Sequence, residues 1–218
     1  GFAGLVGSGR TELMNCLFGV DKRAGGEIRL NGKDISPRSP LDAVKKGMAY
    51  ITESRRDNGF FPNFSIAQNI AISRSLKDGG YKGAMGLFHD VDEQRTAEAQ
   101  RELLALKCHS VNQNITELSG GNQQKVLISK WLCCHPEVII FDEPTRGIDV
   151  GAKAEIYKVM RQLADDGKVI LMVSSELPEI ITVCDRIAVF CEGRLTKILT
   201  NRDDMSEEEI MAWALPQE

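Results

Sequence analysis

The spacing of hydrophobic positions along this chain separates stretches that predict strands from stretches that predict helices. Short apolar runs at residues 48–52 and 138–142 have the length of strands, and the run 169–174 is apolar enough to be covered on both faces. Residues 151–165 have helical spacing, and Gly167 follows as a typical helix stop. This alternation predicts an α/β domain with a mainly parallel, doubly wound sheet and flanking helices.

Turn signals mark two hairpins and one helix start. The Asn-Gly pair at 31–32 lies between two short extended runs and favours a type I′ turn. The Glu-Gly pair at 192–193 lies between the runs 187–191 and 194–199, which predicts a second hairpin. The stretch 206–209 begins with serine and ends with glutamate, the pattern of a capping box at the start of a last helix.

Residues 64–117 follow a different pattern, with helical spacing and little strand signal. Their charged run 92–102 is typical of a solvated helix face. Because this stretch interrupts the alternation of strands and helices, it predicts a helical lobe inserted into the α/β core. We therefore expect a core at 1–63 and 131–218 and a lobe at 64–130.

Composition narrows the class of protein without naming a function. The 218 residues are 42% hydrophobic and 27% charged, which is ordinary for a globular protein. The net charge of −4 argues against a surface that coats nucleic acid, so we expect no nucleic-acid partner. No apolar run approaches the roughly 18 residues of a membrane-spanning helix, so at a membrane another component would have to hold this chain. The sequence starts inside an expected strand and without methionine, which we interpret as a piece of a longer polypeptide.

The first candidate for chemistry is the glycine-rich segment 4–11. It fits the phosphate-binding P-loop spacing G-x-x-x-x-G-K-[ST], except that Arg10 replaces the lysine. The loop's backbone N–H groups and the dipole of the following helix would attract phosphate, and Thr11 would offer its hydroxyl to Mg²⁺. A glycine-rich turn before an ordinary helix is the alternative for this segment alone. The expected phosphate-binding residues are Gly4, Gly7, Ser8, Gly9, Arg10, Thr11 and Glu12.

A second candidate is the pair of carboxylates that ends the predicted strand 138–142. Asp142 at the tip of a core strand can hold Mg²⁺ through water, and Glu143 beside it can orient or deprotonate an attacking water. A plain turn is the alternative for this pair alone. Together with the P-loop, the pair predicts a site for a nucleotide and Mg²⁺.

A third candidate is a second glycine-rich helix start at 118–124, with the sequence L-S-G-G-N-Q-Q. Its backbone N–H groups and helix dipole could bind phosphate as well. One chain has no obvious use for two such cradles on one nucleotide, so we expect this one to close over a nucleotide held by another subunit. A glycine-rich helix cap is the alternative. The expected signature residues are Leu118, Ser119, Gly120, Gly121 and Gln123.

In this order, the P-loop, the L-S-G-G-N-Q-Q segment and the apolar-D-E-P-T segment resemble the ATP-binding cassette of ABC transporters over essentially all 218 residues. The stretches 53–57 and 146–153 resemble the sugar-importer branch (ribose, allose, xylose and galactose type), and within it the second, C-terminal cassette of a fused pair. The resemblance implies a P-loop NTPase cassette whose helical lobe carries the signature motif. It also implies that the N-terminal strands of the family's antiparallel subdomain are missing from this sequence.

The resemblance further implies the partners and the place of work. These are an N-terminal cassette in the same polypeptide, membrane permease subunits and, indirectly, a periplasmic sugar-binding protein. The cassette would lie at the cytoplasmic face of the bacterial inner membrane as a peripheral component. There it would couple ATP binding and hydrolysis to monosaccharide uptake, while the permease and the binding protein would select the sugar.

By the same resemblance Glu143 and Ser175 are the catalytic positions, Thr11, Asp142 and Glu53 the metal positions, and Asp149 the D-loop aspartate. Three of the family's usual residues are replaced. Arginine stands for the P-loop lysine, Glu53 for a glutamine that touches Mg²⁺, and Ser175 for the switch histidine. We therefore expect a degenerate site here, with the signature motif completing the partner cassette's site.

Two other functions remain open at this stage. One is a regulatory module that binds nucleotide without hydrolysing it, favoured by the substitutions at Arg10 and Ser175. The other is a cassette of a translation or DNA-repair factor, which the acidic balance disfavours. Phe60, Phe61 and Phe64 beside a charged loop suit either a contact to the permease or the interior of the lobe.

Overall fold

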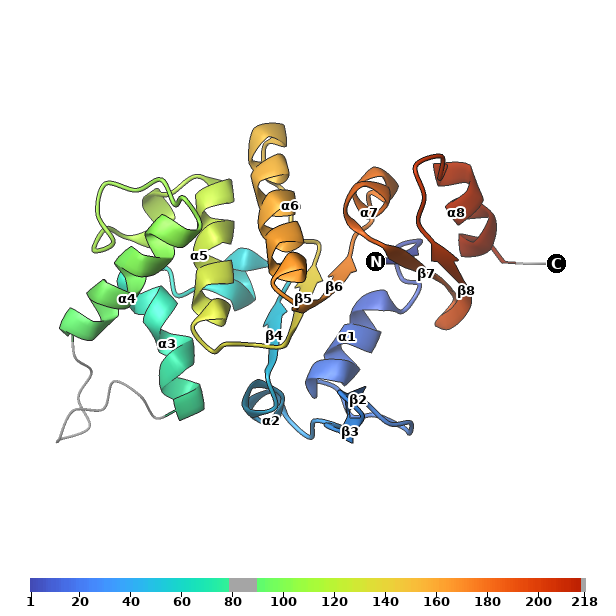
Figure 1. The fold of residues 1–218 in the computed structure, drawn as a ribbon, viewed down its shortest axis with the longest axis horizontal. Helices are drawn as coiled ribbons and strands as arrows, with labels where there is room; N and C mark the ends of the chain where they lie inside the picture. The colour runs from blue at the N-terminus through green and yellow to red at the C-terminus, as the bar shows by residue number, and fades with distance from the viewer. Residues whose placement is uncertain (79–89, 217–218) are drawn as a thin grey trace.

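A six-stranded sheet forms the centre of the molecule in the computed structural model, which describes residues 1–78 and 90–216 (Figure 1). Its strands are β1 (Phe2–Gly4), β4 (Met48–Ile51), β5 (Val138–Asp142), β6 (Val169–Val173), β7 (Arg186–Cys191) and β8 (Arg194–Thr200). They are arranged in the order β4-β5-β6-β1-β7-β8, and every neighbouring pair is parallel except β7 and β8. The carboxyl ends of β1, β5 and β6 therefore meet at one edge, where ligands bind in sheets of this kind.

The remaining elements surround this sheet or extend from it. The helices are α1 (Arg10–Phe18), α2 (Pro40–Lys45), α3 (Ile66–Asp78), α4 (Asp90–Leu103), α5 (Gly120–Leu132), α6 (Val150–Asp165), α7 (Leu177–Val183) and α8 (Glu207–Ala214). A small hairpin joins β2 (Arg29–Leu30) to β3 (Lys33–Asp34). A π-helical turn at Arg55–Gly59 and a 3₁₀ turn at Ile115–Glu117 complete the described part of the chain.

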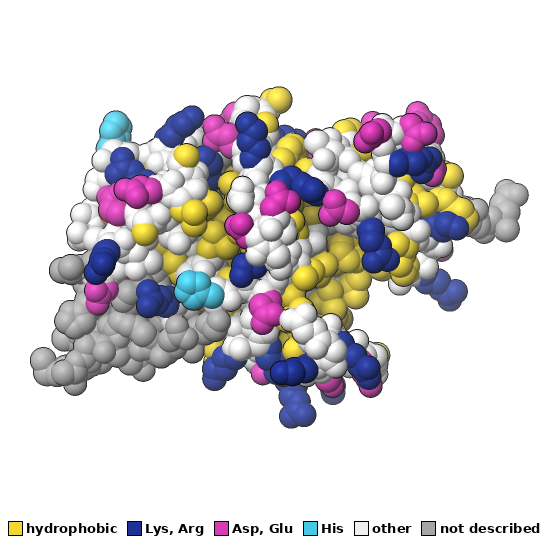
Figure 2. All heavy atoms as spheres, in the orientation of Figure 1, with side chains coloured by type: hydrophobic (Ala, Val, Ile, Leu, Met, Phe, Trp, Pro, Cys, Tyr) yellow, Lys and Arg dark blue, Asp and Glu magenta, His cyan; other side chains and the backbone are white. Residues whose placement is uncertain are grey.

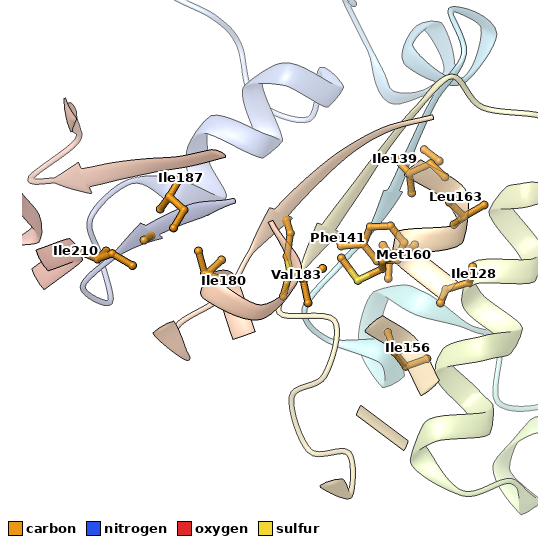
Figure 3. Close-up of a cluster of buried hydrophobic side chains, with 14 of the residues drawn as sticks. Ile128, Ile139, Phe141, Ile156, Met160, Leu163, Ile180, Val183, Ile187 and Ile210 are labelled. Carbon is orange, nitrogen blue, oxygen red and sulfur yellow. The ribbon is translucent and has the colours of Figure 1, made fainter. Parts of the chain in front are cut away.

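Helices cover the sheet on both faces. Successive residues of β5 point to opposite sides of the sheet and therefore pack in two different clusters. Ile139 and Phe141 lie in the cluster drawn in Figure 3, together with Ile156 and Met160 of α6. Ile140 instead lies in a cluster that includes residues of α1 and α2. The predicted α/β layering is confirmed.

Both predicted hairpin turns are confirmed by their backbone angles. Asn31 and Gly32 have φ values of 50° and 76°, and Glu192 and Gly193 have 48° and 76°. Positive φ at both central residues is the signature of a type I′ turn.

One prediction about β6 is wrong. The strand was expected to be covered on both faces, but Val169 at its start is 45% exposed, while Val173 at its end is buried. Val169 lies at the rim of a cavity of about 420 Å³ that Phe2 and Met160 also line. Figure 2 shows hydrophobic side chains open to solvent on this face, below α6. The start of β6 is exposed because nothing in the described chain covers that rim.

The helical lobe has a hydrophobic cluster of its own. Ile70 of α3, Ala97 of α4 and Val126 of α5 belong to it, whereas Ile128 of α5 belongs to the main core. Because α5 contributes to both clusters, the predicted boundary at 130/131 stays a prediction. The part of the predicted lobe at 79–89 lies outside the described residues.

The three phenylalanines before α3 do not share one environment. Phe60 is buried in the lobe cluster, so it packs inside rather than facing a partner. Phe61 is 48% exposed, and its ring centroid lies 5.1 Å from that of Phe64. The side chain of Asn69 fixes this segment, since its Oδ1 accepts from the Phe61 N–H at 2.8 Å and its Nδ2 donates to the Phe61 carbonyl at 3.1 Å.

Across the described residues, no helix combines the length and the apolar character needed to cross a membrane.

Candidate functional site

The P-loop begins where β1 ends, and its shape requires glycine at two positions. A Cβ at Gly4 would lie 2.4 Å from the carbonyl oxygen of Phe190, and Gly9 has φ of 95° just before α1. The Gly193 N–H donates to the Ser8 carbonyl at 2.9 Å, which ties the loop to the turn between β7 and β8. The hydroxyl of Ser8 is buried and has no hydrogen-bond partner in the described chain. A buried hydroxyl without a partner is consistent with a loop that binds a polar ligand.

This loop forms one wall of an open cavity of about 580 Å³. Among the predicted site residues, the cavity lining contains Gly7, Ser8, Gly9, Arg10, Thr11, Glu12, Glu53, Glu143 and Ser175. Arg146 and Glu176 line it as well, and sequence reasoning missed both. Loops after β1, β4, β5 and β6 therefore supply one cavity, as parallel strands that end at the same edge allow.

Asp142 lies behind the P-loop with two hydroxyl donors. Thr11 Oγ1 donates to Asp142 Oδ1 at 3.3 Å, and the Tyr50 hydroxyl donates to Oδ2 at 2.9 Å. Burial raises the pKa of Asp142, although these two hydrogen bonds and Arg10 act in the opposite direction. A hydroxyl beside a carboxylate gives hard oxygen ligands of the kind that Mg²⁺ prefers, so Thr11 and Asp142 fit this ion. Tyr50 was missed because its strand carries no motif.

Glu143 is held by residues at the end of β6. Ser175 Oγ donates to Glu143 Oε2 at 3.2 Å, and the Glu143 N–H donates to the Val173 carbonyl at 2.9 Å. The φ of Glu143 is 48°, which is uncommon for a residue with a side chain and occurs often at functional sites. Burial raises the pKa of this carboxyl, opposed by the hydrogen bond from Ser175. The structure thus brings the two expected catalytic positions into contact.

Arg10 does not extend freely into the cavity. Its side chain is only 7% exposed, and its Nη1 donates to the Ser174 carbonyl at 2.5 Å. Burial lowers the pKa of the guanidinium, and the charges of Glu143 and Asp142 act against that shift. One end of the guanidinium is therefore bound to the Ser174 carbonyl. A lysine side chain at this position would be less restrained, because its compact ammonium has no planar group to hold in place.

Glu53 also has a partner within the protein. Its carboxylate forms an ion pair with the Arg146 guanidinium across the loops that follow β4 and β5. Glu53 was predicted as a metal position by resemblance alone, and the structure places it on the cavity wall in this ion pair.

Behind the cavity, the buried carboxylate of Glu179 in α7 joins three other elements. It accepts hydrogen bonds from Thr145 Oγ1 at 2.6 Å, Ser174 Oγ at 2.8 Å, Tyr157 OH at 2.7 Å and Lys153 Nζ at 2.9 Å. Burial acts to raise the pKa of Glu179, but these four donors outweigh it and hold the pKa below its usual value. The loops that carry Glu143 and Ser175 are thus fixed to one buried anion.

The signature residues lie apart from this cavity, and none of the five lines it. Ser119 is the exposed N-cap residue of α5, and Leu118 and Gly121 are buried. The Gln123 side-chain amide donates to the Leu118 carbonyl at 3.1 Å. The segment predicted as a second phosphate cradle therefore takes no part in lining this chain's own P-loop cavity.

Arg55 connects the signature segment to the loop after β5. Its Nη1 donates to the Gly120 carbonyl at 3.1 Å, and its Nη2 donates to the Gly147 carbonyl at 3.3 Å. Asp149, at the end of that loop, caps α6 by accepting a hydrogen bond from the Ala152 N–H at 3.0 Å. The position predicted as the D-loop aspartate thus has a local structural role as a helix cap.

Comparison with proteins of known sequence gives close relatives. The chain is 98% identical over 100% of its length to the D-allose import ATP-binding protein AlsA of Escherichia coli, covering 43% of that protein. It is 45% identical over 98% of its length to the ribose import ATP-binding protein RbsA of Bacillus cereus, covering 42% of that protein. The chain therefore spans about two fifths of the length of these curated relatives.

Solved structures and the family profile agree with this relationship. The dimeric cassette MJ0796 bound to ADP and Pi matches with a TM-score of 0.75 at 21% identity, over 92% of this chain and 84% of that one. The cassette MJ1267 matches with a TM-score of 0.76 at 23% identity, over 96% and 81%. These likenesses confirm the fold. The profile of the ABC transporter family matches residues 1–146, which is more than half of the chain. The chain therefore belongs to the ABC transporter family, as a cassette built around the P-loop at the end of β1.

Proposed function

We propose that this chain is the ATP-binding cassette of a monosaccharide importer and that it couples ATP binding and hydrolysis to sugar uptake. The observation that carries the proposal is the single cavity formed by the P-loop, Glu143 and Ser175 in a member of the ABC transporter family. Relatives named as D-allose and ribose import ATP-binding proteins support the sugar class. The individual sugar depends on components outside this chain.

In this proposal the P-loop binds the phosphates of ATP through its backbone N–H groups, and the unpartnered Ser8 hydroxyl gains an acceptor. Thr11 and Asp142 would hold Mg²⁺, which supplies charge neutralisation for the phosphates. Glu143 orients a water for attack, and Ser175 fixes the direction of that carboxylate. Such positioning is the main way in which proteins catalyse phosphoryl transfer.

We further propose that this site is the weaker of a pair. Arg10 has one end bound to the Ser174 carbonyl, so it cannot move between phosphates as a compact ammonium does. The exposed signature residue Ser119 lies outside the local cavity and suits a nucleotide held by another cassette. The signature motif would then complete the partner's site, while this chain's own site hydrolyses slowly.

The partners follow from the same proposal. They are a second cassette in the same polypeptide, permease subunits in the membrane and, indirectly, a periplasmic sugar-binding protein. The cassette would work as a peripheral component on the cytoplasmic side. The relatives' greater length leaves room for a second cassette.

A nucleotide-binding regulatory module is the second candidate, because Arg10 and Ser175 both replace residues that contact phosphate in active members of the family. Sugar uptake by the full-length protein with its permease in sealed vesicles separates the two. The transport proposal expects uptake of a pentose or hexose that requires ATP and stops with a non-hydrolysable analogue. Uptake that continues with the analogue, or that does not need this chain, would support regulation instead.

A further inference from the structure

The cavity next to the P-loop holds more negative than positive side chains. Among the residues that the structure describes, its lining includes the acidic residues Glu12, Glu53, Glu143 and Glu176, and its only lysine or arginine residues are Arg10 and Arg146. A nucleoside triphosphate carries several negative charges, and a site of this composition repels it unless cations offset the carboxylates. Arg10 and Arg146 are therefore the two candidates to bind the terminal phosphate.

Arg10 is poorly suited to that task. Its guanidinium is buried, donates to the Ser174 carbonyl and lies near the carboxylates of Glu143 and Asp142. Moving it toward a ligand would leave the buried Ser174 carbonyl without this donor, which is unfavourable.

Arg146 combines a fixed backbone with an exposed side chain. Its N–H donates to the Glu143 carbonyl at 3.2 Å, and the preceding Thr145 is anchored to the buried Glu179. The Arg146 side chain is nevertheless 68% exposed and lines the cavity together with Ser175. The backbone of this long cationic side chain is thus held beside Glu143, while its guanidinium lies at the solvent-exposed wall of the cavity.

The present partner of Arg146 is easily exchanged. Its ion pair with Glu53 joins two side chains that are both exposed, and exposed ion pairs contribute little to stability. A phosphate accepts two parallel hydrogen bonds from a guanidinium and is the stronger partner.

We propose that Arg146 is a second phosphate-binding residue of this site, which exchanges Glu53 for the terminal phosphate when ATP binds. The inference rests on the proposed function and deepens it, because it assigns the cation that distinguishes ATP from ADP. Arg146 projects from the loop that carries Glu143, which places it with the residues expected at the terminal phosphate. Glu53 then acts as a competing anion that keeps Arg146 occupied when the site is empty.

The test measures binding rather than turnover. In the full-length protein, with the other cassette's P-loop disabled by mutation, equilibrium binding of a non-hydrolysable ATP analogue and of ADP, both with Mg²⁺, reports on this site. Arg146→Gln should weaken binding of the ATP analogue about tenfold and leave binding of ADP within about twofold. Arg56→Gln, which removes a positive charge from an exposed position outside this cavity, is the matched control and should change neither.

Glu53→Gln supplies the second arm. It should tighten binding of the ATP analogue a few-fold, because Arg146 is released, and this gain should vanish when Arg146→Gln is also present. Equal losses for ATP analogue and ADP in Arg146→Gln, or a Glu53→Gln gain that persists without Arg146, would overturn the inference alone. If the unmodified site binds neither nucleotide, both the inference and the proposed function fail.

Discussion

Ser175 Oγ donates a 3.2 Å hydrogen bond to Glu143 Oε2, so a side chain at the end of β6 holds the carboxylate that follows β5. The preceding residue, Ser174, supplies the carbonyl that accepts a hydrogen bond from Arg10. One short segment thus controls both the carboxylate expected to orient water and the arginine that replaces the P-loop lysine.

Replacing Arg10 with lysine should strengthen ATP binding and weaken folding. A lysine ammonium can reach the phosphates as a point charge, so we expect ATP affinity at this site to rise several-fold. The Ser174 carbonyl loses its donor, which should lower the free energy of unfolding by about 1 kcal/mol. Equilibrium ATP binding and urea denaturation measure the two effects. Arg10→Ala is the control, and an affinity for Arg10→Lys no higher than that of Arg10→Ala would contradict this account.

Replacing Glu179 with glutamine should remove a pH-dependent part of stability. The folded protein holds the pKa of Glu179 below the unfolded value of about 4.3. The contribution of Glu179 to the free energy of unfolding is therefore present above about pH 4.3 and is lost as the pH falls through the folded pKa. We expect Glu179→Gln to cost about 2 kcal/mol at neutral pH, and the gap to wild type to narrow as the pH falls from about 4.3 through the folded pKa.

Glu176 provides the control for Glu179, because both carboxylates pair with Lys153. Glu176 also pairs with Lys153, but its side chain is 55% exposed. Glu176→Gln should change the free energy of unfolding by no more than about 0.5 kcal/mol. Urea denaturation of both variants and wild type at pH 7 and at successively lower pH down to about pH 3 decides the point, and a Glu179→Gln penalty that stays the same throughout would speak against a charged carboxylate there.

The exposed ring of Phe61 predicts a contact with the permease. Phe61→Ser should leave folding unchanged and reduce co-purification of the cassette with the permease several-fold, because a partly exposed aromatic ring adds most when a partner buries it. Phe60→Ala should instead destabilise the lobe by about 3–5 kcal/mol, since that ring is buried. Unchanged co-purification of Phe61→Ser would place the permease contact elsewhere.

Local sequence signals were enough for much of the fold. The type I′ turns at 31–32 and 192–193 depend on residues that accept positive φ, and the P-loop depends on glycines that avoid a clash. Both are short-range requirements, so adjacent residues reveal them. Val169 was misjudged because an apolar residue predicts burial only if something covers it.

The long-range contacts of the site could not be read from the sequence. Tyr50 on Asp142, Arg146 on Glu53 and the four donors to Glu179 join elements that only the folded sheet brings together. Spacing within one segment carries no information about such pairs.

Gly121 shows how a motif can mislead about the role of one residue. The sequence treats it as a phosphate contact, yet a Cβ there would lie 2.5 Å from the Ala152 Cβ. A substitution at Gly121 would therefore disturb the packing of α5 on α6 as well as any nucleotide contact. Ser119 is the better position for a test, since it is exposed and its hydroxyl accepts only from the Asn122 side chain, at 2.9 Å.

We propose that this chain's signature motif serves the partner's site while its own site contributes little. The most direct measurement is ATP hydrolysis and sugar uptake by the reconstituted full-length transporter carrying Ser119→Asp, Ser119→Asn or Glu143→Gln. Asp and Asn are both good N-caps, so α5 keeps its start and only the charge facing a partner's phosphate differs. The account predicts that Ser119→Asp abolishes most of both activities, Ser119→Asn retains them, and Glu143→Gln slows them far less than Ser119→Asp. Equal activity of the two Ser119 variants, or a larger loss from Glu143→Gln, would contradict it.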